Sequence, residues 1–305
     1  MNGSARAATT SEESPVFFSN GTDTLFGVFT LPTGPALGTA AILLWGSGHL
    51  GSTGRNRIWV RLSRRLAACG FHSFRFDFHG VGDSTGAVER FRLDRPFVED
   101  LEAAVRWVHS QGIERLMLVG WCFGARTVLG APHLKGLQGV VLVSVPVREA
   151  PGGRRLDLSL WEVVRRGLHP QVIQGFLDPE RRGLYLKFAR RYWRAIKIRL
   201  SRRGGEADVV ARMSQTVVDR IADLVERGVP ILFIYGTADV EYADFLEARS
   251  GRLGTVLERA GALAEIVTLP GRVHEVGQID LQDAVIEAVE NWLPRQNRRN
   301  ATPVS

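Results

Sequence analysis

The chain has 305 residues, is 45% hydrophobic and carries a formal net charge of +7. This length suits one large domain or a core with an insert, and the hydrophobic content is ordinary for a globular protein with a sizeable core. The longest apolar runs, such as 40–45 and 140–147, are too short to cross a bilayer. We therefore expect no transmembrane segment, and the small polar N-terminus does not have the pattern of a signal peptide.

The chain contains two cysteines, Cys69 and Cys122, which are too few for a disulfide framework. A reducing, cytoplasmic location fits this count best. No group of Cys and His residues has the spacing of zinc ligands, so we expect no metal site. Cys69 ends a helical run just before a glycine, where a buried packing role is the favoured interpretation.

Short apolar, β-branched runs alternate with amphipathic stretches along the chain. The predicted strands are 24–31, 40–45, 71–77, 115–120, 137–144, 230–236 and 264–269. The predicted helices are 57–69, 96–111, 122–129, 217–227, 241–260 and 281–292. Continuous apolar strands separated by helices predict an α/β fold with a mostly parallel central sheet flanked by helices.

One region, 145–213, breaks this alternation, because no strong strand pattern appears in it. Its segments 161–168, 171–176 and 180–200 have the pattern of short helices. A helical insert here predicts a lid over the carboxyl ends of the strands, where ligands bind in open α/β sheets. The predicted organisation is a core of 15–144 and 214–294, a basic helical lid of 145–213, and loose polar tails at 1–14 and 295–305.

The positive charge is concentrated in this insert. Residues 151–205 hold 14 Lys and Arg against four acidic residues, a local net charge of +10. One interpretation is a solvated amphipathic helix with its aromatic residues turned to the core. The other interpretation is a positively charged entrance to the site, which steers an anionic substrate such as a coenzyme A thioester or an acidic acyl carrier protein. Nucleic-acid binding is the weaker alternative, because no reading motif accompanies the charge.

The strand that ends near residue 119 runs directly into the turn 120–124, Gly-Trp-Cys-Phe-Gly, and a helix follows. This strand–turn–helix context is that of a nucleophile elbow, in which a strained turn lifts one side chain to the edge of the sheet. Here that side chain is the thiol of Cys122, at a helix N-terminus whose dipole favours the thiolate. The alternative is a buried cysteine in a glycine-rich turn.

Two further residues follow predicted strands in the order nucleophile, acid, histidine. Asp239 comes after the strand 230–236, and His274 comes after the strand 264–269. A thiol nucleophile gains from a base that takes its proton, and that base gains from a carboxylate that fixes its tautomer. The sequence therefore predicts a triad of Cys122, His274 and Asp239. Glu241 and Asp83 are weaker alternatives for the acid.

Main-chain N–H groups are expected to bind the oxyanion. One donor would be Phe123, just after the predicted nucleophile. The other would be Ser47, in the loop after the strand 40–45, with Gly48 as the second choice. We expect Gly48, His49 and Trp121 to lie near the substrate.

These features together resemble the α/β-hydrolase superfamily over 15–294, particularly its lidded esterase, thioesterase and serine-aminopeptidase-like branches. The segment 76–84 looks like the D-x-R-G-x-G-x-S segment after the fourth strand, with His79 in place of the common Arg, which implies a structural role. Gly46 matches the second residue of a His-Gly oxyanion signature, in which Trp45 replaces the His. The cysteine nucleophile is similar to that of dienelactone-hydrolase-like members and some biosynthetic thioesterases.

The function that these residues predict is acyl transfer through a covalent acyl-cysteine on Cys122, without a cofactor. A thiolate exchanges readily with thioesters, so a carrier-bound or coenzyme A-bound acyl thioester in a biosynthetic pathway is the favoured substrate. Hydrolysis, transfer to an acceptor and cyclisation all remain open. The alternatives are an ester or lactone hydrolase of the dienelactone-hydrolase kind and a catalytically silent binding protein on a hydrolase scaffold.

Overall fold

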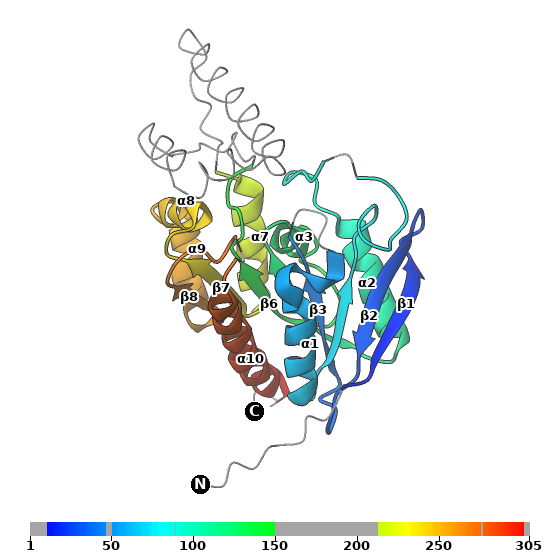
Figure 1. Cartoon of the computed structure of the whole chain (residues 1–305). Helices are drawn as coiled ribbons and strands as arrows, with labels where there is room; N and C mark the ends of the chain where they lie inside the picture. The colour runs from blue at the N-terminus through cyan, green and yellow to red at the C-terminus, as the bar shows by residue number, and fades with distance from the viewer. Residues whose placement is uncertain (1–10, 47–50, 89, 150–212, 276, 302–305) are drawn as a thin grey trace, which may run out of the picture. The chain divides into compact units, whose positions relative to one another are not determined.

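The computed structural model describes residues 11–46, 51–88, 90–149, 213–275 and 277–301. Most of the predicted basic lid, including its three predicted helices, lies outside the described residues. So do Ser47, Gly48 and His49. The fold below is that of the described core (Figure 1).

In the described core, eight strands form one sheet in the order β1-β2-β4-β3-β5-β6-β7-β8. Strand β2 pairs antiparallel with both β1 and β4, and the pairs from β4 to β8 are parallel. The predicted mostly parallel sheet is confirmed. The strands are β1 Glu13–Ser19, β2 Thr24–Thr30, β3 Thr39–Leu44, β4 His72–Phe76, β5 Arg115–Trp121, β6 Leu137–Val143, β7 Ile231–Gly236 and β8 Ala264–Leu269.

Helices cover both faces of this sheet. The helices are α1 Ile58–Ala68, α2 Val98–Ser110, α3 Phe123–Gly130, α7 Gln215–Glu226, α8 Val240–Arg249, α9 Arg252–Ala260 and α10 Ile279–Ala301, with short 3-10 turns at Gly51–Thr53, Arg55–Arg57 and Gly261–Leu263. Helices α1 and α10 lie side by side on one face, and α2, α3 and α7 pack on the other (Figure 1). Each face of the sheet covers its own hydrophobic core. Successive side chains of β3 point to opposite faces, so Ile42 belongs to one core and Leu43 to the other.

None of the helices within the described ranges combines the length and the hydropathy that a bilayer span requires.

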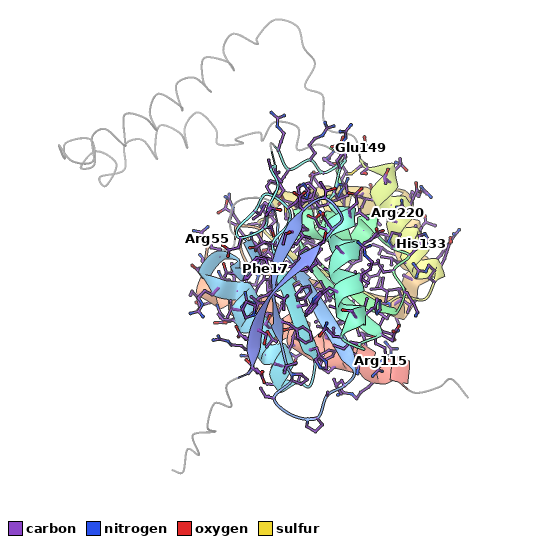
Figure 2. The ribbon with its side chains drawn as sticks, turned by 90° about the vertical axis from the view of Figure 1, so that its right-hand side faces the viewer. Phe17, Arg55, Arg115, His133, Glu149 and Arg220 are labelled. Carbon is purple, nitrogen blue, oxygen red and sulfur yellow. The ribbon has the colours of Figure 1, made fainter. Side chains whose placement is uncertain are left out.

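The N-terminal edge of the sheet differs from the prediction. The sequence pattern predicts no strand before residue 24, and the first two residues of β1, Glu13 and Ser14, fall in the predicted loose tail 1–14. Instead, Glu13 at the start of β1 pairs with Arg64, at 2.6 Å, and with the buried Arg75, at 3.1 Å. This pairing ties the edge strand to α1 and β4. Figure 2 shows Phe17 on this edge strand, where the side chain is exposed.

The C-terminal helix also differs from the prediction. A loose tail was expected from residue 295, but α10 continues through Pro294 to Ala301, so this expectation is wrong for 295–301. Proline removes one helical hydrogen bond and usually ends or kinks a helix. Tertiary contacts offset that cost here, because Gln296 and Asn297 are buried and Thr39 Oγ1 donates to Asn297 Oδ1 at 2.7 Å.

Replacing Asn297 tests this correction. Asn297→Ala leaves the buried hydroxyl of Thr39 without its acceptor, which should lower the free energy of unfolding by about 1–3 kcal/mol. Urea denaturation of the full-length protein measures this change. The control is Arg299→Ala on the exposed side of the same helix, which should change stability by less than about 0.5 kcal/mol. Equal free energies of unfolding for the two variants would show that the end of α10 contributes nothing to stability.

Candidate active site

The predicted elbow lies between β5 and α3. Cys122 has φ 48° and ψ −108° and forms the N-cap of α3, so the chain turns sharply at a non-glycine residue with positive φ. The flanking glycines make this turn sterically feasible. A Cβ on Gly120 would lie 2.6 Å from the main-chain nitrogen of Ala125, and one on Gly124 would collide with main-chain oxygens of β3.

Cys122 and His274 come together as predicted. The imidazole Nε2 of His274 lies 3.1 Å from Cys122 Sγ, within the distance needed for proton transfer. The two residues are 152 positions apart in the chain. The main-chain N–H of Cys122 also donates to the carbonyl of Val143, at 2.8 Å, which ties the elbow to the end of β6.

Asp239 follows β7 and is buried, with 6% of its surface exposed. Both carboxylate oxygens accept the main-chain N–H of His274, at 3.1 Å each. Oδ2 also accepts the main-chain N–H of Gly236, at 2.9 Å. The hydrogen bonds that join Asp239 to His274 in this structure therefore run through the main chain, and they fix the loop that carries the imidazole ring.

Sequence reasoning missed Ser144, a third partner of Asp239. This buried residue directly follows β6, and its hydroxyl donates to Asp239 Oδ2 at 3.2 Å. It adopts φ 44°, and its main-chain N–H donates to Ile234 of the neighbouring strand at 2.8 Å. The only signal in the sequence is a small polar residue at the end of an apolar strand, which turns also use.

Glu241, the weaker alternative for the acid, also lies at the site. Its Oε1 is 3.6 Å from His274 Nε2, the same nitrogen that faces Cys122. Asp83 is elsewhere, in the loop after β4, where its main-chain N–H donates to Asp77 at 3.1 Å. Asp239 therefore holds the loop of His274, whereas Glu241 faces the reactive side of the ring.

The loop after β3 passes beside Cys122. A Cβ on Gly46 would lie 3.2 Å from the Cβ of Cys122, so a side chain there would force its neighbours to shift. Phe123 is the first residue of α3, the position that the predicted oxyanion donor requires. Ser47, the other predicted donor, lies just beyond the described residues.

The structure corrects the prediction for Trp121. Its side chain is only 2% exposed and packs against the rings of Trp45 and Trp59, with centroids 5.6 and 6.0 Å away. We therefore assign Trp121 to the core beneath the elbow and not to substrate binding. The side chain of Phe123 is also fully buried, so only its main chain remains available to a substrate.

The glycine-rich segment after β4 has the structural role that the resemblance implied. The buried Asp77 carboxylate accepts main-chain N–H groups from Ser52 and Asp83. His79, at the position of the common Arg, places Nδ1 2.8 Å from Oδ2 of the buried Asp100, and its main-chain N–H donates to the same oxygen. These contacts hold the loop, so His79 has a structural role here.

Comparison with known proteins agrees with this architecture. The family model described as "Alpha/beta hydrolase family" matches residues 42–287, so the chain belongs to that family. No curated protein is significantly similar to the chain in sequence. Membership of this family supports a hydrolase.

Solved structures share the fold at low sequence identity. Proline iminopeptidase from Mycobacterium smegmatis is 18% identical with a TM-score of 0.57, over 94% of this chain and 100% of that chain. The alpha/beta hydrolase GrgF from Penicillium sp. sh18 is 18% identical with a TM-score of 0.58, over 94% and 98%. Est1E from Butyrivibrio proteoclasticus, with ferulic acid bound, is 17% identical with a TM-score of 0.58, over 92% and 98%.

The two thiols should differ in reactivity. Burial raises the pKa of the Cys69 thiol, and the neighbouring Glu290 carboxylate raises this pKa further, so little of Cys69 is thiolate at neutral pH. Cys122, in contrast, lies at the N-terminus of α3 and faces the imidazole of His274. At pH 7.5, iodoacetamide should modify Cys122 at least roughly tenfold faster than Cys69, as followed by peptide mass spectrometry. Faster modification of Cys69, or an unchanged rate at Cys122 in His274→Ala, would contradict the pairing.

Proposed function

We propose that the protein is an acyl-transfer enzyme that works through a covalent acyl-cysteine on Cys122. The observation that carries this proposal is the 3.1 Å separation of Cys122 Sγ and His274 Nε2 at a nucleophile elbow. His274 is the base, and Asp239 is the residue that positions it. The buried carboxylate has three donors, and a fixed loop keeps the imidazole in reach of the sulfur.

The proposed reaction has two halves. Nε2 of His274 takes the thiol proton, and the sulfur of Cys122 attacks the substrate carbonyl carbon to form a C–S bond. The main-chain N–H groups of Phe123 and Ser47 stabilise the oxyanion. The leaving group departs with the proton from Nε2. In the second half, Nε2 takes a proton from the acceptor, the acceptor attacks the acyl carbon, and the bond to Sγ breaks.

A thioester bound to coenzyme A or to an acidic acyl carrier protein is the proposed substrate. Exchange between a thiolate and a thioester is nearly balanced in energy, so a cysteine nucleophile suits this class. Residues 151–205, within the proposed lid 145–213, carry a net charge of +10, which supports an anionic substrate or carrier. The acyl-cysteine stays activated, which suits transfer or cyclisation in a cytoplasmic biosynthetic pathway as well as hydrolysis.

Hydrolysis of small esters or lactones is the second candidate. Membership of the alpha/beta hydrolase family favours it, because water is the simplest acceptor for the same acyl-cysteine. A catalytically silent binding protein would not need Cys122 and His274 at the distance needed for proton transfer, so the observed 3.1 Å separation counts against that alternative.

The triad is tested by the rates at which the full-length variants cleave 4-nitrophenyl acetate and acetyl-coenzyme A. Cys122→Ala should lose all activity above background, and His274→Ala should lose roughly 100-fold or more. Asp239→Asn should lower kcat by a larger factor than it raises KM, because Asp239 fixes the position of His274. A faster reaction with the thioester than with the ester supports the first candidate, and the reverse supports the second. Activity that survives in Cys122→Ala would refute the proposed nucleophile.

A further inference from the structure

A second carboxylate borders the place where an acyl acceptor must bind. Glu241 Oε1 lies 3.6 Å from His274 Nε2, and Cys122 Sγ lies 3.1 Å from that same nitrogen. The nucleophile that resolves an acyl-cysteine has to reach both Nε2 and the acyl carbon on Sγ. The acceptor therefore binds next to Glu241.

Glu241 differs from the other acidic residues around it. Asp239 is buried and its oxygens are occupied by main-chain N–H groups and by Ser144. Further along α8, Asp244 and Glu247 both pair with Arg148, at 2.7 and 2.6 Å. Within the described part of the chain, the only ionisable side chain that pairs with Glu241 is His274.

The position of Glu241 keeps its charge available to a ligand. Its side chain is 21% exposed and lies in the first turn of α8, where the helix dipole favours a carboxylate. Burial raises the pKa of Tyr235, and the carboxylates of Glu241, Asp244 and Asp239 raise it further.

We propose that Glu241 binds the ammonium group of a primary amine, and that the amine is the acyl acceptor of this enzyme. This inference rests on the proposed acyl-cysteine of Cys122. An ammonium ion offers three N–H donors and a positive charge, so it can donate to Oε1 and to Nε2 at the same time. Water and alcohols carry no charge, so Glu241 gives them no comparable advantage.

Amide formation removes two of the three protons of the ammonium group. One proton of the ammonium passes to the neutral Nε2 of His274, and the amine nitrogen attacks the acyl carbon to form the C–N bond. The C–S bond breaks, and Cys122 leaves as the thiolate beside the imidazolium. A second proton passes to the carboxylate of Glu241 and then to solvent, and the third stays on the amide nitrogen.

The experiment measures how the acetyl-enzyme partitions among acceptors. Full-length protein is mixed with 4-nitrophenyl acetate at pH 7.5, with either methylamine or methanol present, and the ratios of N-methylacetamide and methyl acetate to acetate are determined. Cys122→Ala gives the uncatalysed background. In Glu241→Gln the amide ratio should fall about tenfold or more relative to the methyl acetate ratio, because both products form from the same acetyl-enzyme and only the amine is charged.

Two further variants sharpen the result. Glu241→Asp keeps the charge and should recover part of the amide ratio. Glu275→Gln removes the next acidic residue after His274, one that pairs with Arg272, and should leave both ratios unchanged. An amide ratio that is unchanged in Glu241→Gln, with a normal burst, overturns this inference alone. The absence of any Cys122-dependent burst in the wild-type protein overturns the proposed function and this inference with it.

Discussion

The backbone turn at Cys122 is the constraint on which the rest of the site depends. A cysteine with φ 48° is held between two glycines that neighbouring main chain approaches too closely for any side chain. Such strain persists only where the surrounding structure over-determines it. Here the buried strand β5, the start of α3 and the hydrogen bond to Val143 all fix the turn, and the thiol consequently faces His274.

The parallel sheet supplies the partners of that thiol. Strands β5, β6, β7 and β8 are neighbours and run in the same direction, so their carboxyl ends lie along one edge. The loops after β6, β7 and β8 provide Ser144, Asp239 and His274. Asp239 joins the three loops through hydrogen bonds that are mostly to main chain, which makes the relative position of the loops a property of the fold. Glu241, in the first turn of α8, then brings a second carboxylate to the imidazole nitrogen that faces Cys122.

Much of this arrangement could be predicted from the sequence because its signals are local. The apolar strand, the Gly-Trp-Cys-Phe-Gly turn and the following helix are contiguous, and Asp239 and His274 each directly follow a strand of the same sheet. The contact of Ser144 with Asp239 spans 95 residues and has no motif. The continuation of α10 past Pro294 depends on the burial of Asn297 against Thr39, which propensity does not reveal. Trp121 was misassigned because a position beside the nucleophile does not say which way the side chain points.

Passage of the acyl group through Cys122 can be observed directly in a single-turnover experiment. Full-length protein is mixed with 4-nitrophenyl acetate or with acetyl-coenzyme A, quenched in acid at successive times, and digested for peptide mass spectrometry. An acetyl group is expected on the peptide that contains Cys122, formed before acetate accumulates and lost at the rate of turnover. Turnover without any acetyl group on Cys122, or with the acetyl group on another residue, would contradict the proposed acyl-cysteine.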